Sequence, residues 1–210
     1  MENPMVNYKK IIADTNSRMF NVRDEYKENT LEQNQQICKV DRLPFSVGMI
    51  NVTGCLNIGM ALRSACLLGA ENFYIFGRKK FDARSTVGAE NYINIVQYSY
   101  DDPMTADEHI LAELRELNKT HSVILCEHGG YMLGENDFGW AYEERPSPLF
   151  IFGSESHGIP KLITDQVASD GYPEYEFERI SIPQRGVLRS FNVSAAMAIV
   201  CWDYIKDMGL

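Results

Sequence analysis

The chain has 210 residues, of which 45% are hydrophobic and 23% are charged, and its formal net charge at pH 7 is −9. This composition is typical of a globular domain and excludes collagen-like and intrinsically disordered chains. The acidic balance argues against a protein that coats nucleic acid nonspecifically, because such binding depends on neutralising phosphates. The net charge is still compatible with a local basic patch on an otherwise acidic protein.

The five cysteines are odd in number and form no CxxC pair. They therefore predict small buried thiols in a reducing compartment, and neither a disulfide framework nor a metal centre. The longest apolar run, from Ala195 to Trp202, is shorter than the roughly 18 residues that a membrane span needs. The first twenty residues are polar and lack the apolar core of a signal peptide. We expect a cytoplasmic protein without a membrane partner.

Residues 1–44 are polar and mixed in charge, and we expect them to form an N-terminal extension that contacts RNA or a second copy of the chain. Two apolar patches, Ile11-Ile12 and Met19-Phe20, suggest short helices there. Pro44 marks the predicted boundary with a domain over residues 45–210.

Short apolar runs alternate with helical patterns along this domain. The expected strands are 46–51, 72–77, 93–98, 122–126, 149–152 and 180–182. The expected helices are 58–68, which ends at Gly69, then 106–118 and 192–208, and long loops are expected over 129–148 and 170–178. The alternation predicts an α/β fold, with a mostly parallel sheet and helices on both faces.

Three predicted strands run into polar, glycine-rich turns, and in parallel sheets ligands bind beyond such strand ends. The turns are Asn51–Gly59, Gly153–Pro160 and Pro183–Ser194. These polar residues also have a simpler interpretation. Asn57 could be a helix N-cap without any further role, and so could the residues from Ser190 to Ser194. Three such turns in one α/β chain favour a binding site.

The residues present argue against two familiar active-site motifs. The segment Ser154–Gly158 is close to the G-x-S-x-G turn of hydrolases, whose order of catalytic residues requires a histidine further along the chain. No histidine follows His157. A phosphate-binding loop needs Lys followed by Ser or Thr, and Ile159-Pro160 stands there instead. A dinucleotide-binding G-x-G-x-x-G is also missing after the first strand.

Together the three turns resemble the SpoU (TrmH-like) branch of the knotted RNA methyltransferases, over about residues 46–205. The first family motif is an Asn, a Gly two residues later and an Arg six residues later, and it matches Asn57, Gly59 and Arg63. The second, Gly-x-Glu-x-x-Gly after a strand, matches Gly153, Glu155 and Gly158. The third is Ile-x-Ile-Pro followed by a Ser-Leu-Asn-Val-Ser-like turn, and it matches Ile180–Pro183 and Ser190–Ser194.

The resemblance implies a C-terminal deep trefoil knot, S-adenosylmethionine as cofactor and a homodimer whose site the partner subunit completes. The implied cofactor-binding residues are Cys126, Glu127, Gly153, Ile182 and Phe191. The implied catalytic residues are Arg63, Asn57, Glu155, Ser190 and Asn192. The implied activity is methyl transfer to a ribose 2′-hydroxyl of RNA.

Arg63 would engage that hydroxyl, either as a base or as a positioned cation, since arginine is almost always protonated. Asn57 would hold Arg63 in place, and Glu155 would either orient Arg63 or cap the nearby turn. Local positive charge could bind phosphates at Arg78, Lys79, Lys80, Arg84, Arg185 and Arg189.

By resemblance, tRNA is the expected substrate, with guanosine in the D-loop as the expected target. Ribosomal RNA and the tRNA wobble position are the rivals. An idle RNA-binding scaffold is a second hypothesis. Methylation of guanine N1 is disfavoured, because the turn from Pro183 to Ser194 lacks the Asp of that related branch.

Overall fold

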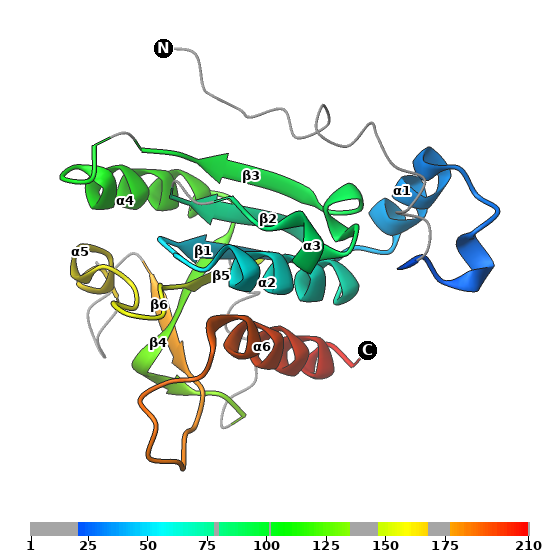
Figure 1. Ribbon diagram of the computed structural model, residues 1–210. Helices are drawn as coiled ribbons and strands as arrows, with labels where there is room; N and C mark the ends of the chain where they lie inside the picture. The colour runs from blue at the N-terminus through cyan, green and yellow to red at the C-terminus, as the bar shows by residue number, and fades with distance from the viewer. Residues whose placement is uncertain (1–20, 78–79, 101, 135–146, 168–176, 210) are drawn as a thin grey trace.

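The computed structural model describes residues 21–77, 80–100, 102–134, 147–167 and 177–209 (Figure 1). Its centre is a six-stranded parallel sheet in the order β3-β2-β1-β5-β4-β6. The strands are β1 (Leu43–Ile50), β2 (Ala70–Phe76), β3 (Asn94–Tyr98), β4 (Ser122–Met132), β5 (Pro148–Phe152) and β6 (Glu178–Ser181). The described helices are η3 (Asp24–Tyr26), α1 (Leu31–Val40), α2 (Cys55–Leu67), α3 (Ala83–Thr86), η4 (Ala89–Asn91), α4 (Ala106–Leu117), α5 (Lys161–Thr164) and α6 (Val193–Asp207). Within the described residues, no helix has the length and apolarity to cross a membrane.

Helices cover both faces of the sheet, as the alternating pattern predicts (Figure 1). One apolar cluster joins α2 and α6 to one face, and a second joins α4 and α5 to the other. Strand β5 shows the cause, because Phe150 packs in the first cluster and its neighbour Ile151 in the second. Successive side chains of a strand point to opposite faces, so a strand buried on both sides is apolar throughout. The expected α/β architecture is confirmed.

Helix α1 precedes the sheet and was not predicted from the sequence. A capping box starts it: the Thr30 hydroxyl accepts from the Gln33 amide, and the Gln33 side chain accepts from the Thr30 amide. The Gln35 side chain donates to the Asn91 carbonyl at 2.8 Å, which ties α1 to η4. The segment from residue 21 onward therefore lies against the domain. The apolar patches Ile11-Ile12 and Met19-Phe20 lie outside the described residues.

Two boundaries differ from the predictions. Strand β1 begins at Leu43, so Pro44 lies inside it, at its exposed beginning, where a missing N–H is tolerated. Strand β4 continues to Met132, where a loop was expected from residue 129. An irregularity between Cys126 and Tyr131 interrupts its pairing with β6, and this break hid the second half of the strand from the sequence pattern. The implied knot stays a prediction.

Candidate functional site

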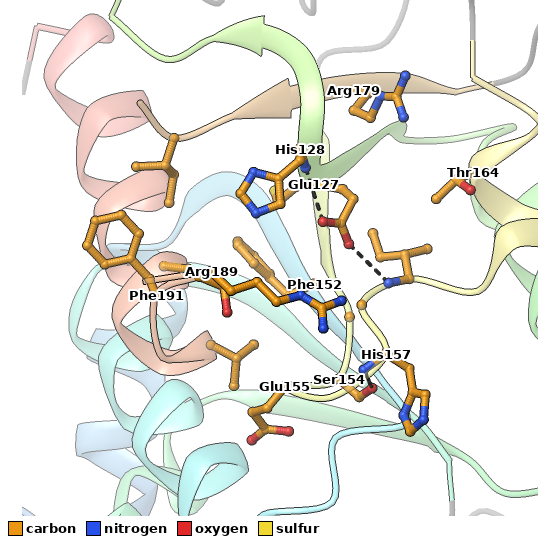
Figure 2. Close-up of a pocket in the computed structure, with 18 of the residues that line it drawn as sticks. Glu127, His128, Phe152, Ser154, Glu155, His157, Thr164, Arg179, Arg189 and Phe191 are labelled. Atoms are coloured by element: carbon orange, nitrogen blue, oxygen red, sulfur yellow. Dashed lines mark hydrogen bonds between the residues drawn. The ribbon is translucent and has the colours of Figure 1, made fainter. Parts of the chain in front are cut away.

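A cavity of about 500 Å³ lies beyond the carboxyl ends of β5 and β6 and against the middle of β4 (Figure 2). Its walls combine apolar side chains, such as Phe152, Ile180 and Val193, with polar groups from the irregular part of β4 and from the turns that follow β5 and β6. Cavities of this size and mixed lining hold small organic ligands. All five residues that the resemblance assigns to the cofactor line it: Cys126, Glu127, Gly153, Ile182 and Phe191.

Glu127 is held in the cavity wall by the irregularity of β4. The buried Ser181 hydroxyl donates to the Glu127 carbonyl at 2.7 Å and accepts from the Gly130 amide at 2.9 Å, so it closes the bulge. The Glu127 carboxylate accepts from the His128 amide at 3.1 Å and from the Ile159 amide at 3.2 Å (Figure 2). A carboxylate offers about four acceptor positions, so Glu127 can still accept from a ligand.

The turn after β5 is tight because of its two glycines. Paired backbone hydrogen bonds join Ser154 to Gly158 at 3.0 and 2.9 Å. A Cβ on Gly153 would lie 2.1 Å from the Gly158 carbonyl carbon, and one on Gly158 would lie 2.5 Å from a Glu127 oxygen. The buried Ser154 hydroxyl accepts from the His157 amide at 3.2 Å, so it stabilises the turn.

The same turn presents Glu155 to a network of side chains from three distant segments. The Asn57 side-chain amide donates to the Glu155 carboxylate, and the Asn192 amide donates to the Asn57 oxygen at 3.1 Å. Asn192 also caps α6, since its oxygen accepts from the Ser194 amide at 3.0 Å. Asn57 is not a helix cap, because Gly54 occupies that position of α2. The three turns singled out by the sequence therefore meet at one place.

Arg63 stands apart from this network. It lies six residues after Asn57 on α2, which turns its side chain by about 120° from the Asn57 direction and raises it by about 9 Å. Arg63 is exposed, and within the described part of the chain it makes no hydrogen bond or ion pair. The expected pairing of Arg63 with Glu155 is therefore not found, since Glu155 bonds Asn57 instead.

Residues 44–202 match the family model of the SpoU rRNA Methylase family. The chain belongs to this family. Among curated protein sequences, none matches the chain significantly.

Solved structures of SpoU proteins share the fold. The TrmH/SpoU tRNA-modifying enzyme of A. aeolicus has a TM-score of 0.62 and 19% identity, covering 85% of this chain and 82% of that one. AviRb of Streptomyces viridochromogenes, solved with AdoMet, has a TM-score of 0.57 and 21% identity, covering 80% of this chain and 58% of that one. An RNA 2′-O ribose methyltransferase has a TM-score of 0.59 and 19% identity, covering 81% and 58%.

This SpoU chain lines its cavity with further polar residues that the sequence did not single out. They are His128, His157, Lys161, Thr164, Arg179 and Gln184. Arg179 belongs to β6, and its Nε atom is buried without a hydrogen-bond partner among the described residues. Arg179 sits inside a strand, where one charged residue carries no sequence signal of a site. Glu127 and Gly153, by contrast, were assigned to the site by the family resemblance, and both line the cavity.

The basic residues expected to bind RNA occupy different positions in the SpoU domain. Arg189 lines the cavity, and its side chain extends from the segment before α6 toward Ser154 and His157 (Figure 2). Arg185 and Lys80 are exposed. Arg84 pairs with Asp82 at 2.6 Å, and this guanidinium lowers the pKa of the Asp82 carboxyl to about 2. Arg78 and Lys79 lie outside the described residues.

Proposed function

We propose that this SpoU methylase transfers the methyl group of S-adenosylmethionine to a ribose 2′-hydroxyl of RNA. The observation that carries the proposal is the convergence of Asn57, Glu155 and Asn192 beside the cavity. These residues come from three turns far apart in the sequence, and no single helix or strand requires them to meet.

The cavity fits the cofactor in size and in chemistry. Phe152, Ile180, Ile182 and Val193 supply apolar surface for a flat adenine. Glu127 keeps free acceptor positions for the hydroxyls of a ribose, as acidic residues do in nucleotide sites. Arg179 and Lys161 offer positive charge for the carboxylate of the amino-acid part. The AdoMet-bound AviRb structure is consistent with this use of the fold.

The bound cofactor supplies a methyl group already activated on a sulfonium, so the protein has to align the acceptor and help to remove its proton. In our proposal the Asn57–Glu155–Asn192 network orients the ribose beside the cavity, and Ser190 at the cavity wall adds a polar contact. A positioned guanidinium would lower the pKa of the 2′-hydroxyl without itself losing a proton. We assign this part to Arg63.

The position of Arg63 supports a homodimer in which it serves the partner's site. On α2, Arg63 shares one exposed stripe with Leu56, Met60 and Leu67, and Leu67 is 76% exposed. Helix α6 lies beside α2 (Figure 1) and exposes Trp202 by 59%. Large exposed apolar side chains gathered on neighbouring helices are typical of a protein interface. A second copy that covers these apolar side chains would bring Arg63 close to the partner's site, whereas Arg63 lies apart from the site of its own protomer.

The RNA in this proposal is tRNA, with a guanosine of the D-loop as the target. The support for this substrate is the resemblance of the motifs. Phosphate contacts would come from the exposed side chains of Lys80, Arg84 and Arg185. The extension over residues 1–44 would add contacts to RNA or to the second copy.

The test is methyl transfer from labelled S-adenosylmethionine to unmodified tRNA and rRNA pools, followed by digestion to nucleosides. Wild type is compared with Arg63→Ala and with Arg115→Ala, a control at an exposed arginine of α4. We expect a 2′-O-methylated guanosine from tRNA with wild type and the control, and none with Arg63→Ala. A methylated base would contradict the reaction, and label only in rRNA would contradict the substrate. The absence of both methyl transfer and cofactor binding would favour an idle scaffold.

A further inference from the structure

A second cavity, of about 310 Å³, lies beyond the carboxyl ends of β1 and β2. It is bounded on one side by the first turn of α4, to which Ala106 and Asp107 belong. None of the motifs shared with the SpoU family assigns a role to it.

The inner walls of this cavity are apolar and partly aromatic. Phe76 and Ile58 are buried, and the half-buried ring of Tyr100 forms another part of the lining. Flat aromatic ligands fit such walls, because their faces are apolar and stack on aromatic side chains.

The rim of the cavity is polar. It carries the Asn51 amide, the Thr53 hydroxyl and the Asp107 carboxylate. Asn51 adopts a positive φ of 50° at the end of β1, and its side-chain oxygen lies over Gly77, 3.1 Å from where a Cβ would be. Among the described residues, Asn51 and Asp107 form no side-chain hydrogen bond or ion pair. Apolar walls with unused donors and acceptors at the rim suit a planar ring with a polar edge.

The second cavity lies next to the proposed reaction centre. Ile58 in its wall follows Asn57, and the segment from Asn51 to Thr53 in its rim leads into α2. Glu155, the partner of Asn57, lines the first cavity. The Asn57–Glu155 contact thus joins a residue next to the lining of the second cavity to a residue in the lining of the first.

Positive charge follows directly from the same place. Gly77, in the lining, precedes the basic segment that includes Lys80 and, after it, Arg84. Phosphate groups of an RNA chain could bind there while a base enters the cavity.

We propose that this second cavity binds the splayed-out base of the nucleotide that is methylated, and that the base is guanine. The proposal rests on the proposed function in taking an RNA nucleotide as the methyl acceptor. Asp107 favours guanine, because a carboxylate can accept from two neighbouring N–H groups and only guanine presents such a pair on its pairing edge. The Asn51 amide can donate to the adjacent guanine oxygen.

The first experiment measures binding of guanosine monophosphate, with no methyl transfer involved. The probe is titrated into isotope-labelled protein holding excess S-adenosylhomocysteine in the first cavity, and NMR shift changes are mapped. We expect changes at Tyr100, Ala106 and Asp107, with adenosine and uridine monophosphates at least about tenfold weaker. Changes confined to the first cavity, or none at millimolar probe, would overturn the proposal.

Two variants and one control test the assignment. Asp107→Asn keeps the shape and removes the double acceptor, so guanosine monophosphate should lose about tenfold in affinity while adenosine monophosphate changes little. Ala106→Phe should fill the cavity, whereas Ala112→Phe places the same ring at an exposed position of α4. Equal affinity for guanosine monophosphate in all three folded variants would refute the site.

Kinetics then separates this inference from the proposed function. With RNA substrate, Asp107→Asn should raise KM for the RNA about tenfold and leave S-adenosylmethionine affinity unchanged. If wild type transfers no methyl but guanosine monophosphate still binds beside Asp107, the proposed function fails and the base site stands. If transfer is normal in Ala106→Phe, the base site fails and the proposed function stands.

Discussion

At the residue scale, Asn192 performs two tasks with one amide. Its oxygen caps α6 by accepting from the Ser194 amide at 3.0 Å and from the Ser194 hydroxyl at 2.6 Å. Its nitrogen donates to Asn57 at 3.1 Å. The capping interpretation is therefore confirmed for Asn192, its functional role stays a prediction, and matched substitutions can separate the two.

Asn192→Asp should keep the cap, because Asp caps helices as well as Asn does. It should lose the donor to Asn57, so methyl transfer is expected to fall by at least about tenfold at little cost in stability. Asn192→Ala should lose both tasks and about 1 kcal/mol of unfolding free energy. Urea denaturation and the methyl-transfer assay, run on both variants, measure the two effects. Full activity in Asn192→Asp would show that the contact with Asn57 is not needed.

The Glu178 carboxyl makes the stability of the fold depend on pH. Burial raises the pKa of its carboxyl, so its charged form is less favourable in the folded chain than in the unfolded one. The raised pKa contributes stability that is present below the unfolded value, near pH 4, and lost as pH rises through the folded value. Glu178→Gln should therefore raise Tm at pH 7 by roughly 1–3 °C and leave it nearly unchanged at pH 3.5. An equal gain at both pH values would assign the effect to something other than charge.

At the element scale, the glycine of the first motif serves packing between two helices. A Cβ on Gly59 would lie 1.8 Å from the Ser85 hydroxyl and 2.9 Å from the Asp82 carbonyl. The Asp82 amide donates to the Cys55 carbonyl at 3.1 Å, which fixes the start of α3 against α2. Gly59 therefore keeps α3 close to the turn that carries Asn57.

Gly59→Ala should destabilise the fold by about 1–3 kcal/mol, because α3 has to move away from α2. Adding Ser85→Ala removes the closest atom, although Cβ of residue 85 would still lie 3.0 Å away, so recovery should be partial. Chemical denaturation of the single and double variants gives the two values. Unchanged stability in Gly59→Ala would contradict the tight contact.

The elements show which parts of the fold a sequence pattern can predict. All six expected strands and the three expected helices correspond to observed elements, with bounds that differ by a few residues, since apolar periodicity marks them. Helix α1 was missed because few of its residues are apolar, and a capping box and a contact with η4 hold it in place. The far half of β4 was missed because a glycine-rich bulge, held by Ser181, interrupts it.

At the scale of the whole molecule, our proposal divides the site between two copies of the chain. Arg63 lies on an exposed stripe of α2, away from Asn57, Glu155 and the cavity of its own protomer. If Arg63 acts in the partner's site, two differently inactivated chains can restore each other, because a mixed dimer contains one complete site.

Mixing Arg63→Ala chains with Glu127→Ala chains tests this division. Each variant alone should be inactive, the first without its guanidinium and the second with weakened cofactor binding. After mixing and exchange, about a quarter of the wild-type activity is expected, since half of the dimers are mixed and each has one working site. Mixing two Arg63→Ala preparations is the control. No recovery in exchanged dimers would place Arg63 in its own protomer's site.

The sequence by itself determined the layered α/β architecture, because period-2 and helical apolar patterns decide which face of each element is buried. Its motifs also pointed to Asn57, Glu155 and Asn192, which meet in the structure, and the family resemblance pointed to five cofactor residues, which line the first cavity. Only the tertiary structure decided which of these side chains touch one another. It separated Arg63 from Glu155, brought Arg179 into the first cavity and formed the second cavity from β1, β2 and α4. Such contacts depend on how distant segments pack in three dimensions, and local patterns in the chain contain no record of that packing.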